Sequence, residues 1–111
     1  MKVINIARQF SDFPVGHHYE DGPDSGERFR DEFLETPLRN KEPVRIELSG
    51  VEGYGSLFLS EAFGGIVRKL GLTQSEANKL LTFSADPQDQ TFVDEIRGYI
   101  ADACAATSGS K

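Results

Sequence analysis

The sequence predicts an α/β fold, in which a small mixed β-sheet is covered by about four helices. Two observations predict it. Short segments rich in β-branched residues occur at 2–7, 43–51 and 80–85. Longer segments with apolar residues at helical spacing lie between and after them. Alternating strands and helices favour one α/β layer with a mostly parallel or mixed sheet.

Composition narrows the class of protein. The chain has 111 residues, of which 38% are hydrophobic and 27% charged, as in a globular domain. Its net charge of −6 disfavours nucleic acid and anionic membranes as partners. The apolar stretches are shorter than a membrane span and the N-terminus lacks a signal-peptide layout. We therefore expect a cytoplasmic protein with a single domain at 1–104 and a flexible tail at 105–111.

The first third of the chain predicts a strand, a long loop and a helix. Residues 2–7 form the strand, and the loop that follows is rich in Gly, Pro, Asp and Ser, with room for a short strand at 16–20. Asp24 followed by Glu27 resembles a capping box, so a helix is expected to start there. This helix should end just before Pro37, which biases the preceding residue away from helical geometry.

The middle of the chain predicts the clearest strand and the longest apolar helix. Apolar and charged residues alternate at 43–51, which indicates a strand with one buried face. Helical spacing then runs over 56–70. Gly64 and Gly65 lie inside this helix, at a cost of about 1 kcal/mol each relative to alanine. We expect the pair to permit close packing against the sheet.

The last third predicts a short helix, a strand and a final helix. Gly71 is the expected C-terminal cap of the preceding helix, and 73–76 ("TQSE") reads as a capping box. A strand follows at 80–85. Asp86, followed by proline, is typical of a helix start, and the apolar stripe of that helix runs to Cys104.

A glycine-rich turn at the start of the 56–70 helix is the main candidate site. Gly50 and Gly55 have the spacing of a phosphate-binding loop, but Ser56 occupies the position of its lysine. Phe58 occupies the third glycine position of a dinucleotide fingerprint. Two interpretations stay open: free N–H groups of the helix start bind a phosphate, or the turn is structural and Ser56 caps the helix.

The other reactive side chains predict no chemistry. Adjacent residues of an extended segment point to opposite sides, so His17 and His18 are not expected to bind one metal. Cys104 falls on a core stripe, and the many carboxylates fit a solvated face. We expect no catalytic residue, no metal and no cofactor, and therefore no enzyme.

The same turn predicts a surface for a protein partner. Leu57 and Phe58 widen the apolar face of the helix beyond one narrow stripe, and a small domain buries such a helix on every side only with difficulty. The expected partner or ligand surface consists of Gly53, Tyr54, Gly55, Ser56, Leu57, Phe58 and Glu61.

Two segments carry a family resemblance. These are "DGPDSGERFR" at 21–30 and "GYGSLFLSEAFGG" at 53–65. With the strand before the second segment and "DEIRGYI" near the end, the chain resembles the bacterial STAS-like family of domains of unknown function over roughly residues 3–99. STAS domains include anti-sigma-factor antagonists and the cytoplasmic domains of sulfate transporters.

The resemblance implies a regulatory interaction module. In the antagonists, a partner kinase phosphorylates a serine that follows a strand and begins a helix, and the phosphate blocks docking. Ser56 is at the matching position and is the implied switch. Tyr54 and Gly55 replace the aspartate and first serine of that motif, and Leu57 replaces a serine of the STAS-like pattern. The implied partner is a histidine-kinase-like ATPase. The alternative is a domain that binds a small ligand, nucleotide or anion at the helix start over 53–56. The sequence leaves the oligomeric state open.

Overall fold

Three parallel strands form the sheet in the computed structural model, which describes residues 1–108. In spatial order these strands are β1 (Lys2–Asn5), β2 (Val44–Glu47) and β3 (Leu81–Ser84). Ile4 is paired with Ile46, which is paired with Phe83. Side chains in one such row share a face of the sheet, and this row faces the core. The expected α/β class is confirmed, with every strand pair of the described residues parallel.

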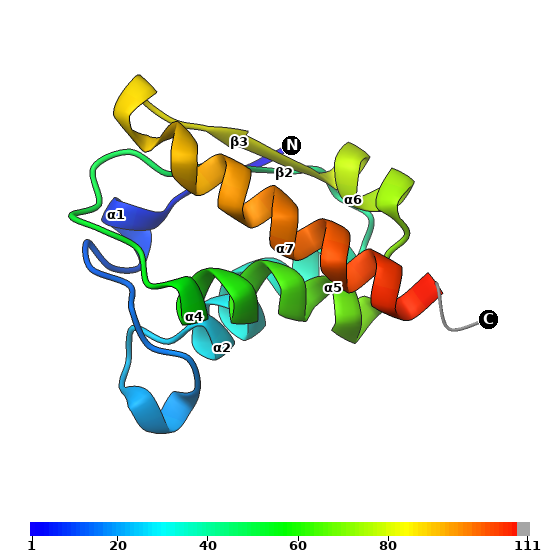
Figure 1. Cartoon of the computed structure of the whole chain (residues 1–111), viewed down its shortest axis with the longest axis horizontal. Coiled ribbons are helices and arrows are strands. Elements are labelled where there is room, and N and C mark those ends of the chain that lie inside the picture. Colours follow the sequence, from blue (N-terminus) through cyan, green and yellow to red (C-terminus); the bar gives the residue numbers. More distant parts are fainter. Residues whose placement is uncertain (109–111) are drawn as a thin grey trace.

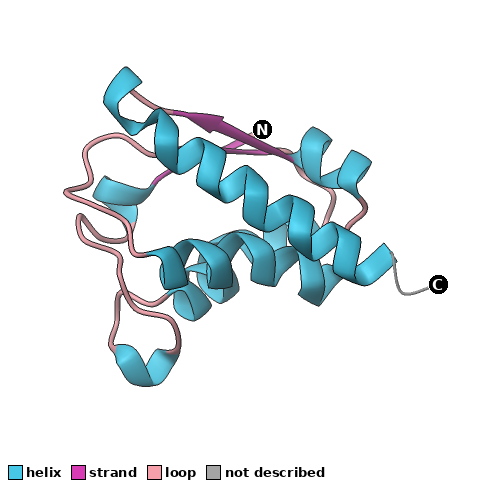
Figure 2. Cartoon of the chain, viewed as in Figure 1, coloured by secondary structure: helices cyan, strands magenta, loops and turns pink. Residues whose placement is uncertain are grey.

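Within residues 1–108, five helices accompany the sheet, and two of them contain a π-helical turn (Figures 1 and 2). The first helix is α1 (Ile6–Gln9). The second consists of α2 (Gly26–Phe29), the π turn η2 (Arg30–Leu34) and α3 (Glu35–Arg39), and the third of α4 (Ser56–Leu59), the π turn η3 (Ser60–Gly64) and α5 (Gly65–Leu70). The fourth is α6 (Gln74–Leu80), and the fifth is α7 (Gln90–Ser108), which follows the 3-10 turn η4 (Pro87–Asp89). None of the helices within residues 1–108 has both the length and the apolar character needed to cross a membrane.

The helices cover one face of the sheet. Figure 1 shows α2, α4 and α5 as a layer below the strands, with α7 running across them. Val3, Arg45 and Thr82 are paired across the strands and are exposed, so the opposite face of the sheet is open. The core lies between the layers. Its largest fully buried side chains are Phe29, Phe58, Phe63, Ile4, Ile6, Leu34, Leu38, Ile46, Leu48, Leu59, Ile66 and Leu72.

Several helix boundaries differ from the sequence prediction. Asn5 ends the first strand early, because its side chain accepts a hydrogen bond from the backbone N–H of Arg8 at 3.0 Å and so starts α1. Ser25, not Asp24, caps α2. The helix also continues past Pro37. This proline lies in the first turn of α3, after the π turn, where its missing N–H removes no bond within that segment.

Other local signals are confirmed. Gly71 ends α5 in the left-handed conformation, with φ of 66°. Both hydrogen bonds of the capping box between Thr73 and Glu76 are present. The last helix extends to Ser108, beyond the expected boundary at 104, so only residues 109–111 of the expected tail lie outside the described residues.

Candidate functional site

Ser56 is the first residue of α4 and is exposed. The N-cap is Gly55, and no side chain caps the helix, so the interpretation in which Ser56 acts as the cap is wrong. Gly55 is required for steric reasons: a Cβ there would lie 2.9 Å from both the Cα and the carbonyl oxygen of Val15. The glycine turn is thus shaped by a second loop that packs against it.

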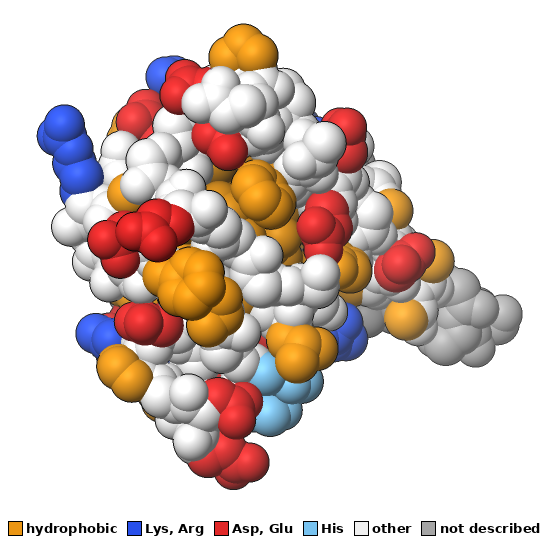
Figure 3. Space-filling view, turned by 60° about the vertical axis from the view of Figure 1, so that its left-hand side comes forward, with side chains coloured by type: hydrophobic (Ala, Val, Ile, Leu, Met, Phe, Trp, Pro, Cys, Tyr) orange, Lys and Arg blue, Asp and Glu red, His pale blue; other side chains and the backbone are white. Residues whose placement is uncertain are grey.

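This second loop, residues 12–15, brings further apolar side chains to the turn. The Gly55 N–H donates to the Pro14 carbonyl at 3.0 Å, next to two exposed residues, Phe13 and Val15. Leu57 is exposed as well, at 58% of its surface. Phe13, Val15 and Leu57 are called the Leu57 patch below. Figure 3 shows hydrophobic side chains among acidic ones on this face, with the histidines beside them.

Phe58 does not belong to this surface. It is fully buried, and its ring centroid lies 5.7 Å from that of Phe29 in the core. Tyr54 is half-buried and donates a hydrogen bond from its hydroxyl to the Leu48 carbonyl at 2.7 Å. Burial, followed by the charge of Asp89, raises the pKa of the Tyr54 hydroxyl. The expected surface residue Phe58 is therefore a core residue, because α4 turns this position towards α2.

The two segments that carry the family resemblance meet at a close helix crossing. Gly26 is the first residue of α2, and a Cβ there would lie 2.5 Å from the carbonyl oxygen of Phe58. Ser25 before it is fully buried and accepts a hydrogen bond from the Arg28 N–H at 3.1 Å. The cap and the glycine together allow the backbones of α2 and α4 to touch.

One turn further along, Arg30 of η2 and Glu61 of η3 form a salt bridge between the two helices. Their side chains are only 12% and 13% exposed. Burial alone would lower the pKa of Arg30, but Asp31 and Glu61 outweigh it and raise that pKa. A Cβ at Gly65 would lie 3.1 Å from the Arg30 guanidinium, so this glycine leaves room for the arginine.

Gly64 and Gly65 permit close packing, as expected, but not against the sheet. A Cβ at Gly64 would lie 3.3 Å from the Arg68 guanidinium and 3.5 Å from the Tyr99 carbonyl of α7. Gly65 faces Arg30, as described above. The glycine pair therefore faces the π turn η2 and helix α7.

His17 joins this network through Glu61. Its Nε2 lies 2.9 Å from Glu61 Oε1, and the His17 and His18 rings stack with centroids 3.7 Å apart. The expectation that the histidines point to opposite sides is wrong. The segment is not a regular strand, because only Gly16 forms an isolated bridge with Ser25 and the chain turns into the 3-10 turn η1 (Tyr19–Asp21).

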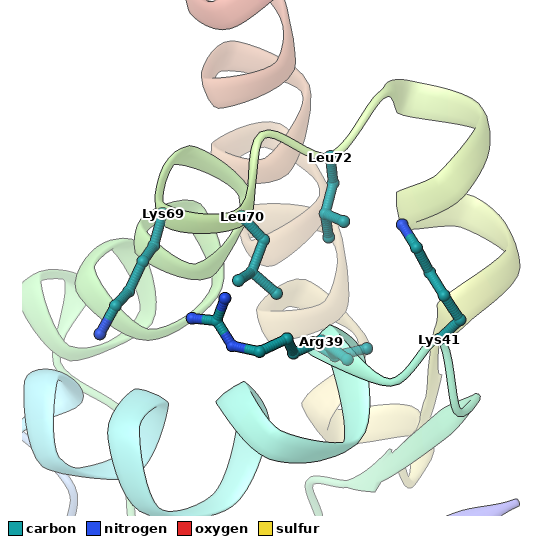
Figure 4. A pocket seen from close by; sticks show the side chains of 6 residues that line it. Arg39, Lys41, Lys69, Leu70 and Leu72 are labelled. Carbon is teal, nitrogen blue, oxygen red and sulfur yellow. The ribbon is translucent and has the colours of Figure 1, made fainter.

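A separate cavity of about 170 Å³ lies at the far end of the 56–70 helix. Its walls combine three cationic and three leucine side chains: Leu38, Arg39, Lys41, Lys69, Leu70 and Leu72 (Figure 4). The cations bind carboxylates, as Lys41 does with Glu76 at 2.9 Å and Lys69 with Glu35 at 2.8 Å. The cavity therefore lies away from the glycine turn at 53–56, where the sequence predicts the alternative ligand site.

Comparison with known proteins identifies the family. The family model described as "STAS-like domain of unknown function (DUF4325)" matches residues 25–90, which are 66 of the 111 residues. No curated protein and no solved structure matches the chain. The matched range is narrower than the expected 3–99. It includes Arg30, Ser56, Leu57 and Glu61 but not the loop with Phe13, Val15, His17 and His18.

Proposed function

Because the chain belongs to the STAS-like domain family of unknown function, we propose that it is a non-catalytic regulatory module that binds another protein at the Ser56 turn. One observation carries this proposal. The Leu57 patch consists of three exposed apolar side chains from the 12–15 loop and from the start of α4, and this loop packs against Gly55, next to the exposed Ser56. Exposed apolar clusters rimmed by polar residues are typical of protein interfaces.

The Leu57 patch supplies a reason for binding. Complete burial of a leucine, valine or phenylalanine side chain contributes about 1.5–3 kcal/mol. The exposed fraction is 53% for Phe13, 43% for Val15 and 58% for Leu57. A partner that covers these side chains therefore gains roughly half of the full burial energy for each. Such a patch suits the apolar centre of a small, reversible interface.

Ser56 is the proposed switch of this interface. Phosphorylation would add about −1.5 to −2 charge directly beside Leu57. In the free domain, the N-terminal end of the 56–70 helix stabilises this charge. In a complex, the charge would lie in an apolar contact and lose its hydration. The phosphate would therefore favour the free domain over the complex.

The proposed partner is a histidine-kinase-like ATPase, as the resemblance to anti-sigma-factor antagonists suggests. The test is isothermal titration calorimetry of the purified domain with each such ATPase from the same genome. We expect at least one to bind. We expect Ser56→Asp to weaken binding at least tenfold and Leu57→Asp to weaken it further. If no ATPase of this class binds the wild-type domain, the partner class is wrong.

Val3→Asp provides the matched control. Val3 is 49% exposed, similar to Leu57, but lies on the open face of the sheet in β1. A charge at Val3 should leave the affinity unchanged. Equal loss of binding in Val3→Asp and Leu57→Asp, or wild-type affinity in Leu57→Asp, would contradict the proposed surface.

A further inference from the structure

We propose that His17, His18 and Glu61 bind a divalent metal ion of the zinc class. One ligand atom from each of the three residues lies within 4.8 Å of the other two. Two imidazoles and one carboxylate form a ligand set that suits zinc. The proposal is independent of the proposed interface, because it rests only on these side chains and their surroundings.

The geometry requires only small side-chain movements. Ligand atoms at about 2.0–2.1 Å from a tetrahedral zinc ion lie about 3.4 Å from one another. His17 Nε2 and Glu61 Oε1 are 2.9 Å apart, and one ligand atom from each of the three residues lies within 4.8 Å of the other two. Movements of about 1 Å, by rotation about the χ angles, therefore bring the three atoms to coordination distance.

The backbone already holds the three residues together. The Gly26 N–H donates to the Gly16 carbonyl at 2.9 Å, and the Glu27 N–H donates to the His17 carbonyl at 3.1 Å. The histidine loop is thus fastened to the start of α2, which itself touches α4, the helix that leads into Glu61. A site held from several elements loses less entropy when it binds an ion.

The surrounding charges favour a cation. Glu27 lies 3.5 Å from Nδ1 of His18, and Asp31 lies beside Arg30. Together with Glu61 these are three carboxylates around one guanidinium, with Lys69 at 3.4 Å from Asp31 as a second cation. Arg30 binds Oε2 of Glu61 and thereby orients the carboxylate, whose Oε1 faces His17. Carboxylates held in this way are typical of metal sites.

Three protein ligands leave a coordination position for water or for a group from another molecule. π-Helical turns are frequent at functional sites, and Glu61 lies in one while Arg30, its partner, begins the other. The geometry therefore fits an open metal site better than a closed structural one.

The test is titration of the metal-free full chain with Zn²⁺ by calorimetry, repeated with Co²⁺ and monitored by visible absorption. We expect one ion per chain with a Kd below about 10 μM and the intense absorption of four-coordinate Co²⁺. His18 is exposed, so His18→Ala should fold normally and bind at least tenfold more weakly. Glu61→Gln, if folded by circular dichroism, should weaken binding to a similar extent.

Glu20→Gln is the control, because Glu20 is an exposed carboxylate of the same loop. It should bind Zn²⁺ like the wild type. The proposal is overturned if the wild type shows no saturable binding below about 100 μM. It is also overturned if His18→Ala, or folded Glu61→Gln, binds as tightly as the wild type, or if Glu20→Gln loses as much affinity as His18→Ala.

Discussion

Gly26 is the residue on which the crossing of α2 and α4 depends. The carbonyl oxygen of Phe58 occupies the space that a side chain would need, since it would lie 2.5 Å from a Cβ at this position. We expect Gly26→Ala to lower the free energy of unfolding by about 1–3 kcal/mol, because backbone, not a flexible side chain, must shift. Urea unfolding followed by circular dichroism measures the loss.

Gly98 is the matched control for this substitution. It lies in the interior of α7 and is exposed, and apart from its chain neighbours and the backbone of its own helix no atom lies within 4 Å of an added Cβ. Gly98→Ala should raise the free energy of unfolding by about 0.5–1 kcal/mol through helix propensity alone. A Gly26→Ala protein that gains stability as Gly98→Ala does would show that the helix crossing is not tight.

The sequence predicts those residue roles that depend on near neighbours. Gly71 and the capping box of Thr73 with Glu76 were predictable because each makes its bonds within one turn of helix. The contacts of Glu61 with Arg30 and His17 at the candidate site were not predictable in this way. Arg30 and His17 reach Glu61 across 31 and 44 positions of the chain, and no local pattern encodes such contacts. The only signal was that Arg30 and Glu61 both fall in the two resemblance segments.

At the scale of elements, a salt bridge joins the two helices that contain π turns. Glu61→Gln would leave the largely buried Arg30 with Asp31 at 3.0 Å and the more distant Glu27 at 3.9 Å as its carboxylate partners. We expect the free energy of unfolding to fall by about 1–3 kcal/mol, because a buried charge loses a hydrogen-bonded partner. The measurement is urea unfolding in the presence of a chelator, which removes any contribution from metal.

An exposed ion pair on the same helix calibrates this effect. Arg28 and Glu32 are four residues apart and 3.1 Å from each other, with side chains 35% and 48% exposed. Glu32→Gln should change the free energy of unfolding by no more than about 0.5 kcal/mol. If both substitutions have equally small effects, the salt bridge between Arg30 and Glu61 does not hold the helices together.

The apolar pattern predicts most elements but not their irregularities. Strands β2 and β3 and helices α6 and α7 lie within or close to the segments that the sequence predicts for them. The π turns at Arg30–Leu34 and Ser60–Gly64 interrupt two helices, although the spacing of apolar residues in the sequence predicts uninterrupted α-helices there. Pro37 marked a helix end in the sequence, but the π turn changes the register and lets the helix continue.

At the scale of the whole molecule, the carboxylates predict how stability depends on pH. Burial would raise the pKa of Asp31, but the Arg30 hydrogen bond and charge hold it below its ordinary value of 3.8. Hydrogen bonds from Lys69 and Arg39 lower the pKa of Glu35 in the same way. A lowered pKa in the folded state stabilises the protein above the ordinary pKa, and this stability is lost as the pH falls through the folded value.

We therefore expect the free energy of unfolding to decrease steadily from about pH 5 to about pH 2. Asp31→Asn should be less stable than the wild type at neutral pH and should show a shallower decrease. Chemical unfolding at a series of pH values measures both. An unchanged slope for Asp31→Asn would mean that Asp31 does not contribute to this dependence.

Three surface regions of the molecule differ in character, and we propose that the Leu57 patch is the one that binds a partner. The Leu57 patch lies at the N-terminal end of the 56–70 helix, while the cationic cavity lies at the other end. The open sheet face, with Val3 and Arg45, is a third region. The apolar pattern and the resemblance both led to a predicted surface at Ser56, but only the fold shows that Phe58 is buried and that the exposed Phe13 and Val15 lie in a loop that packs against the turn.

The most direct test is an NMR titration of the ¹⁵N-labelled domain with the ATPase that binds it. We predict that the largest amide shift changes or line broadening fall at residues 12–18 and 53–61, and that Ser56→Asp needs at least tenfold more partner to produce them. The largest changes at the open sheet face or around the cavity at Leu72 would contradict it.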